Sequence, residues 1–291
     1  MQFDTIGYWS EIKLDIVKNY SAPYSKILTS RRNPGFFHVY IDAFAGAGIH
    51  VSKTTGEFVS GSPRNALDIE PPFREYHFID LNPKKVNLLR DTVGQRPDVS
   101  IYEGDCNFIL QQRVFPRVQY KDYRRGLCLL DPYGLHLKWE VIETAGQMGT
   151  IDIFLNFPVA DMNRNVLWHN PEGVEAADIE RMNAFWGDDS WREIAYTSDG
   201  NLFGYEEKTS NEAIAEGFRE RLRKVAGFKH VPKPMPMCNS NSAIVYYLFF
   251  ASQKPVAMGI VEDIFNSYRN RGTRQWRRTL PSSGLKPPGI R

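Results

Sequence analysis

The stretch of sequence that decides the fold is His38-Val-Tyr-Ile-Asp-Ala-Phe-Ala-Gly-Ala-Gly48. A short apolar run ends in Asp42, and a loop that contains Gly46 and Gly48 follows it directly. Glycine adopts backbone angles that other residues avoid, so the two glycines allow a tight turn that comes close to a ligand. The stretch therefore predicts a buried strand that leads into a ligand-binding loop.

Four further apolar runs of this kind follow along the chain, at residues 75–80, 99–105, 127–131 and 151–156. Helix-length segments separate them, and two later runs, at residues 229–237 and 243–251, complete the set. Continuously apolar strands that alternate with helices are typical of a parallel sheet covered on both faces. We therefore expect an α/β fold with a doubly wound, mostly parallel seven-stranded sheet and an inserted helical cap.

The remaining segments are placed around this sheet by their composition. We expect an N-terminal helical segment at 1–35, as one helix or as two broken by Pro23, and a ligand-binding core at 36–158. Residues 159–228 are expected to form the helical cap, and residues 229–268 the strands and helix that complete the sheet. The last segment, 269–291, holds seven basic residues and no acidic one. It predicts a flexible tail that either keeps the chain soluble or binds phosphate groups.

Composition excludes several classes of protein. Hydrophobic residues make up 42% and charged residues 24% of the 291 residues, as in an ordinary globular protein. The longest apolar run has eight residues, 244–251, whereas a membrane-spanning helix needs roughly 20. The N-terminus lacks a secretory pattern, so we expect a cytoplasmic protein with no membrane partner. The three cysteines and six histidines show no metal-ligand spacing, which predicts that there is no metal site.

Ligands of open parallel sheets bind beyond the carboxyl ends of the strands. Asp42 stands before the glycine loop, Asp80 ends the second run, and Asp105 ends the third. An acidic residue in the position of Asp80 usually binds ribose hydroxyls, and a carboxylate in the position of Asp105 suits the exocyclic amine of adenine. A nicotinamide-dependent enzyme is disfavoured, because Val51 stands where the third glycine of the dinucleotide-binding motif would be.

These strand ends resemble those of the class I S-adenosylmethionine-dependent methyltransferases over residues 36–158 and the two late strands. The resemblance implies S-adenosylmethionine as the cofactor. It places Gly46 and Gly48 beside the methionine part, Asp80 at the ribose, and Asp105 with Cys106 beside the adenine.

Phe44 and the motif Asp131-Pro132-Tyr133 are more similar to enzymes that methylate exocyclic amino groups of nucleic-acid bases. By that resemblance Asp131 and the carbonyl of Pro132 accept hydrogens of the target amine, and the ring of Tyr133 stacks on the base. The motif here has one proline fewer than in those enzymes. Asn156-Phe157-Pro158, at the end of the fifth strand, either compensates for the missing acceptor or only caps a turn.

A narrower resemblance is to the three-Cys-motif partner proteins. It rests on the glycine loop and on Gly61-Ser-Pro-Arg-Asn-Ala-Leu67, Ile79-Asp-Leu-Asn-Pro83, Leu130-Asp-Pro-Tyr-Gly134 and Asn156-Phe-Pro158. It implies a radical-SAM protein of the three-Cys-motif type as partner. Two functions remain open at this point: methyl transfer to a nucleic-acid amino group, and an accessory role for the radical-SAM partner without methyl transfer.

Overall fold

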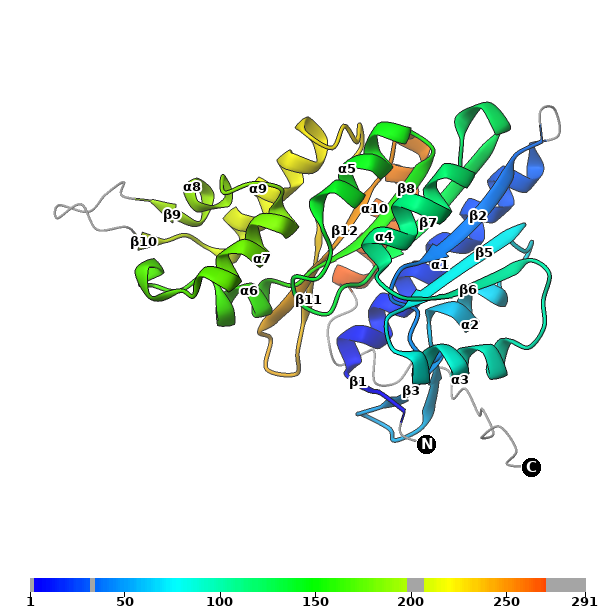
Figure 1. The fold of residues 1–291 in the computed structure, drawn as a ribbon, viewed down its shortest axis with the longest axis horizontal. Helices are drawn as coiled ribbons and strands as arrows, with labels where there is room; N and C mark the ends of the chain where they lie inside the picture. The colour runs from blue at the N-terminus through cyan, green and yellow to red at the C-terminus, as the bar shows by residue number, and fades with distance from the viewer. Residues whose placement is uncertain (1–2, 32–34, 198–206, 271–291) are drawn as a thin grey trace.

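The computed structural model describes residues 3–31, 35–197 and 207–270, which form an α/β structure around one large sheet (Figure 1). Its strands are β2 (Phe37–Asp42), β5 (Glu75–Asp80), β6 (Val99–Glu103), β7 (Arg124–Leu130), β8 (Ile151–Phe157), β11 (Met235–Cys238) and β12 (Ile244–Ala251). They lie in the order β11-β12-β8-β7-β2-β5-β6, and β12 alone runs antiparallel to its neighbours. The predicted doubly wound, mostly parallel sheet of seven strands is confirmed.

Strand β2 lies at the point where the strand order reverses. It pairs in parallel with β5 on one side and with β7 on the other. The chain proceeds from β2 to β5 and β6 in one direction and then returns to β7 and β8 in the other. The loop that follows β2 therefore occupies the position where doubly wound sheets bind their ligands.

Helices cover both faces of the sheet. One face packs against α1 (Tyr8–Ser30), α2 (Ser62–Leu67), α3 (Pro83–Val93) and α10 (Pro255–Asn270). The other packs against α4 (Cys106–Ile109), the π-helical turn Leu110–Val114 and α5 (Trp139–Met148). Side chains alternate between the faces, so Leu127 and Leu129 of β7 face α1. The N-terminal segment forms a single helix, with Pro23 inside α1.

The inserted helical cap is also confirmed, at the left end of the molecule in Figure 1. It contains α6 (Val159–Asn165), the 3₁₀ turn Pro171–Gly173, α7 (Ala176–Trp186), α8 (Trp191–Ala195), β9 (Tyr196–Thr197), β10 (Glu207–Lys208) and α9 (Asn211–Lys224). Trp186 and Trp191 are buried in its core together with Phe185 and Phe218. Two of the tryptophans of the cap therefore stabilise the fold and are not available to a ligand.

The sequence did not predict a small second sheet, which consists of β1 (Thr5–Ile6), β3 (Ile49–Ser52) and β4 (Phe58–Ser60). Its strands β3 and β4 lie between the glycine loop and α2, and β1 comes from the start of the chain. The Ser52 hydroxyl donates a hydrogen bond of 2.7 Å to the buried Glu11 carboxylate of α1, which ties this sheet to the N-terminal helix. The start of α1 is thereby held beside the carboxyl end of β2.

The last part of the chain was predicted to form a strand at 229–237 and to end in a basic tail. In the run at 229–237, His230 forms an isolated bridge with Ser252, and the continuous strand β11 begins only at Met235. Pro232 and Pro234 lie between the two, and proline has no N–H for a ladder. Most of the predicted basic tail, residues 271–291, lies outside the described residues. Over the described ranges, no helix is long and apolar enough to cross a bilayer.

Candidate functional site

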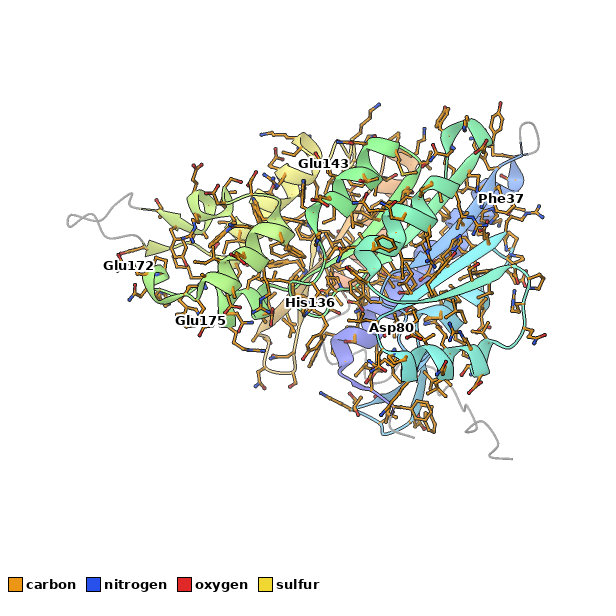
Figure 2. All side chains as sticks on the ribbon, in the orientation of Figure 1. Phe37, Asp80, His136, Glu143, Glu172 and Glu175 are labelled. Carbon is orange, nitrogen blue, oxygen red and sulfur yellow. The ribbon has the colours of Figure 1, made fainter. Side chains whose placement is uncertain are left out.

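The carboxyl ends of β2, β5, β6 and β7 bring the predicted residues to one edge of the sheet. In register, Asp42 of β2 pairs with Phe78 of β5, and Asp80 pairs with Glu103 of β6. Asp80 is the last residue of β5, and His136 lies in the loop after β7; Figure 2 labels both toward the same end of the sheet. We call this edge, with the loops that follow the strands, the carboxyl edge.

The glycine loop and Asp80 are bonded to each other. The Gly46 amide donates to Asp80 Oδ2 at 2.8 Å, and the Asn82 amide donates to Asp80 Oδ1 at 2.8 Å. Gly46 and Gly48 both have positive φ, and a Cβ on Gly48 would lie 2.9 Å from Leu89 Cδ1. The two glycines are therefore required by the backbone, and the half-buried Asp80 carboxylate is fixed at the loop.

Asp42 lies beneath this loop and is fully buried. Its Oδ1 accepts a hydrogen bond of 3.2 Å from the amide of Phe44, whose side chain is half-buried. No described residue bonds its Oδ2. Burial raises the pKa of Asp42 to about 7, because the charged form loses its hydration. The structure thus places Asp42 where it shapes the loop from below.

Asp105 and Cys106 begin α4. Asp105 caps the helix by accepting a 3.0 Å bond from the Asn107 amide. The Asn107 side chain donates to the His136 carbonyl at 3.0 Å and accepts from the Lys138 amide at 2.8 Å, which joins the loops after β6 and β7. Burial raises the pKa of the Cys106 thiol to about 12, so this cysteine remains a neutral, unreactive group.

Three large apolar side chains at the carboxyl edge are exposed. Leu81 is 73% exposed, Phe108 59% and Tyr133 90%, and they follow β5, β6 and β7 respectively. Exposed apolar groups on neighbouring loops suit the faces of a flat ring. Of these three, the sequence predicted only Tyr133 as a site residue. Leu81 directly follows Asp80 and Phe108 is two residues after Cys106, so their proximity to predicted site residues was the available signal.

Asp131 forms an ion pair that the sequence did not predict. Its Oδ2 accepts a hydrogen bond from the ammonium group of Lys13, a buried lysine of α1 that stands 118 positions earlier in the chain. Lys13 Nζ also lies 5.3 Å from the centre of the Tyr246 ring. A lysine inside an amphipathic helix pattern carries no signal of such a role, because its partner depends on how the helix packs.

Asn156 lies next to Asp131 at the end of the adjacent strand. Leu130 of β7 pairs with Leu155 of β8, so the residues that follow each of them are neighbours on the same face. Asn156 is buried, and no described residue bonds its Oδ1. A buried acceptor without a donor is rare in folded proteins, and it suits the N–H groups of a ligand.

The rest of the Asp131-Pro-Tyr-Gly motif is shaped by the cap. Pro132 is buried, and Gly134 has a φ of 68°. A Cβ on Gly134 would lie 2.8 Å from Asp161 Oδ2 of α6, so a larger residue does not fit there. The motif is therefore bounded by α6, with the Tyr133 ring exposed beside it. Within the described part of the chain, no group of three His, Cys, Asp or Glu side chains could hold a metal ion.

Comparison with known proteins supports the fold. No family model matches the chain, and no curated protein matches its sequence. A Legionella pneumophila protein is similar in structure, with a TM-score of 0.50 and 14% identity over 89% of this chain and 93% of that one. A candidate S-adenosylmethionine-dependent methyltransferase from Listeria monocytogenes has a TM-score of 0.42 and 10% identity, over 81% and 98% of the two chains.

A Leishmania major SAM-dependent methyltransferase has a TM-score of 0.39 and 10% identity, over 82% of this chain and 72% of that one. The strand order and the similarity to the Legionella pneumophila protein show a Rossmann-like, doubly wound α/β fold. Fold similarity at these identities does not extend to substrate or partner, because one fold serves many reactions.

Proposed function

We propose that this chain is an S-adenosylmethionine-dependent methyltransferase that acts on an amino group of a nucleic-acid base, beside a radical-SAM partner protein of the three-Cys-motif type. The observation that supports this most is the convergence at the carboxyl edge. There the Gly46–Asp80 bond, the exposed Leu81 and Phe108, and the Asp131-Pro-Tyr motif all follow neighbouring parallel strands.

The residues at this edge suit the parts of the cofactor. The positive-φ glycines allow the methionine part to approach the backbone, and the Asp80 carboxylate accepts hydrogen bonds from hydroxyl groups such as those of ribose. Leu81 and Phe108 offer apolar faces to an adenine ring. When bound, the cofactor supplies a methyl group on a sulfonium that is already activated for transfer.

The acceptor side is supplied by β7 and β8. Lys13 fixes the orientation of the Asp131 carboxylate through Oδ2. Asp131 Oδ1, the Pro132 carbonyl and Asn156 Oδ1 are the acceptors that would hold the hydrogens of a target amine. The exposed Tyr133 ring would stack on the base that carries it. Catalysis then consists mainly of orienting the amine toward the methyl donor.

The ion pair also favours a second function. Because Lys13 already compensates the charge of Asp131, this carboxylate is a weaker acceptor than an unpaired one. A chain that binds the cofactor or its product as an accessory subunit of the radical-SAM partner, without methyl transfer, is consistent with this pairing. The partner's activity in the presence and absence of this chain, together with a search for labelled methyl groups on oligonucleotides, separates the two functions.

The first test of the proposal is calorimetric titration of the chain with S-adenosylmethionine and with S-adenosylhomocysteine. Asp80→Ala removes a charged acceptor, and loss of hydrogen bonds to it should weaken binding by roughly 10- to 100-fold. Asp91→Ala is the matched control, because Asp91 is an exposed carboxylate on α3. Equal affinity of wild type, Asp80→Ala and Asp91→Ala, or no binding at all, would contradict the cofactor site.

A further inference from the structure

A second group of side chains lies at the opposite end of the sheet from the candidate site. The Arg125 guanidinium lies 4.8 Å from the centre of the Phe36 ring and 4.5 Å from that of Tyr120. The ring of Tyr123 meets Phe36 edge to face, with centroids 6.4 Å apart. Phe37, which adjoins Phe36, lies far from Asp80 and His136 in Figure 2. These side chains form a stack of rings around one cation.

The outer members of the stack are open to solvent. Tyr120 is 65% exposed and Tyr123 49%. Arg117 and Lys121 are exposed in the same segment, and residues 117–125 hold four basic residues and one acidic residue, Asp122. We call Phe36, Arg117, Tyr120, Lys121, Tyr123 and Arg125 the arginine–tyrosine patch. It combines exposed aromatic faces with an excess of positive charge.

The backbone of the patch is strained. Tyr123 has a φ of 55°, in the left-handed region where a bulky side chain is an outlier. Its amide closes the 3₁₀ turn Tyr120–Asp122 by donating to the Tyr120 carbonyl, and its own carbonyl accepts from the Phe37 amide. Glycine or asparagine would occupy this position at lower energy. An exposed tyrosine held there at a cost in stability indicates that its ring has a use.

We propose that the arginine–tyrosine patch binds single-stranded nucleic acid. Proteins that bind single strands pair cations that follow the backbone with aromatic rings on which bases stack. Tyr120 and Tyr123 offer the rings, and Lys121 offers a cation. Arg117, which lies 3.6 Å from a Glu75 carboxylate oxygen, adds a second cation at the edge of the patch. Charge distinguishes this surface from the cap, where residues 159–197 hold eight acidic and three basic residues and repel a polyanion. The inference goes beyond methyl transfer and does not rest on it.

Fluorescence anisotropy with a labelled oligothymidylate of about 10 nucleotides, added to the full chain without cofactor, tests the patch. Tyr120→Ala should weaken binding by roughly tenfold, because one stacked base is lost. Lys121→Ala should reduce the slope of log affinity against log salt by about 0.7, the value for one phosphate contact on a single strand. Trp168→Leu, which removes an exposed ring from the acidic cap, is the matched control and should leave binding unchanged.

Tyr123→Asn separates binding from folding. Asparagine tolerates the left-handed backbone, so the urea midpoint of unfolding should not fall, while oligonucleotide affinity should fall by roughly fivefold or more. No binding of the oligonucleotide overturns the proposal. Equal affinity in all variants also overturns it, because the residues of the patch would then make no contribution. Binding of polyglutamate in place of the oligonucleotide would show a docking site for an acidic protein instead. None of these outcomes depends on the cofactor titration.

Discussion

The two ends of the central sheet differ in whether their buried acceptor oxygens have hydrogen-bond partners. At the amino end, Glu75 pairs with His77 at 2.9 Å and with Arg124, and Asp152 accepts hydrogen bonds from Tyr20 and Ser252 at 3.0 and 2.6 Å. At the carboxyl edge, Asp42 Oδ2 and Asn156 Oδ1 are buried, and no described residue bonds them. Two nitrogens at the amino end, His38 Nδ1 and Arg124 Nε, also lack a described partner, so the difference concerns the acceptor oxygens. The carboxylates at the amino end are bonded within the fold, whereas the unbonded oxygens of Asp42 and Asn156 lie at the carboxyl edge, beside the candidate site.

The free energies involved make this difference informative. A buried polar atom without a partner destabilises a protein by roughly 1 to 3 kcal/mol. The unbonded oxygens of Asp42 and Asn156, together with the exposed Leu81, Phe108 and Tyr133, lie where doubly wound sheets bind ligands. Departures from good local packing that coincide at one place are typical of functional sites.

The largest expected effect concerns Asp42, where the comparison predicts a pH dependence. Burial raises its pKa to about 7, above the 3.8 of an unfolded chain, so the folded state binds the proton more tightly. Protonated Asp42 makes its full contribution to the free energy of unfolding below about pH 4. This contribution, about 4 kcal/mol, is lost as the pH rises through about 7. Asp42→Asn should remove this dependence of the free energy of unfolding on pH. Urea unfolding of both chains near pH 4 and near pH 8 measures it.

The amino end supplies the counterpart of that experiment. Burial raises the pKa of Asp152 to about 6, and hydrogen bonds from Ser252 and Tyr20 act in the opposite direction. Asp152→Asn should therefore remove a smaller change of stability with pH, of roughly 3 kcal/mol, that ends at a lower pH. If Asp152→Asn removed more of the pH-dependent stability than Asp42→Asn, the proposed difference between the two ends would be wrong.

The second effect concerns the ion pair at the carboxyl edge. Asp131→Ala leaves the buried Lys13 ammonium without its partner and should lower the free energy of unfolding by roughly 2 to 3 kcal/mol, because Asp131 itself is only half-buried. The double variant Lys13→Met with Asp131→Ala should recover most of this loss, since no buried charge remains. Thermal or urea unfolding of the single and double variants measures the coupling free energy between Lys13 and Asp131. If the effects of the two substitutions simply add, the two side chains do not interact.

A third, smaller effect compares one glycine at each end. Gly48 and Gly94 both have positive φ, and Gly94 follows α3 with nothing near its missing Cβ. Alanine should destabilise the fold by about 1 kcal/mol or more at Gly94, and by more at Gly48, where its Cβ would also meet Leu89. Only Gly48→Ala should also weaken S-adenosylmethionine binding in the calorimetric titration. Equal affinity of the two variants would show that the glycine loop has a structural role only.

The smallest effect on stability is expected for Tyr133. Its side chain is 90% exposed, so Tyr133→Ala should change the free energy of unfolding by less than about 0.5 kcal/mol. Methyl transfer to an oligonucleotide acceptor should nevertheless fall by roughly tenfold, because the stacking surface is lost. Full activity in this variant would remove Tyr133 from the acceptor side of the site.

Much of the site could be predicted because it follows strand ends directly. Gly46, Gly48, Asp80 and Asp105 are each within a few residues of an apolar run, and parallel strands bring such positions to one edge. The sequence predicted that Asp80 and Gly46 lie close together, but it did not predict the hydrogen bond between the Gly46 amide and the Asp80 carboxylate. The small sheet of β1, β3 and β4 was missed, because its strands have only two to four residues and carry little periodicity.

What the sequence by itself determined is the alternation of apolar strands with helices, and with it the parallel sheet and the edge at which the candidate site lies. Tertiary structure alone decided that Lys13 reaches Asp131, that Asn156 Oδ1 has no described partner, and that Arg125 lies between Phe36 and Tyr120. The physical reason is range. Periodicity and turn chemistry act over a few residues, whereas these contacts join side chains from separate elements and depend on how helices and loops pack on the sheet.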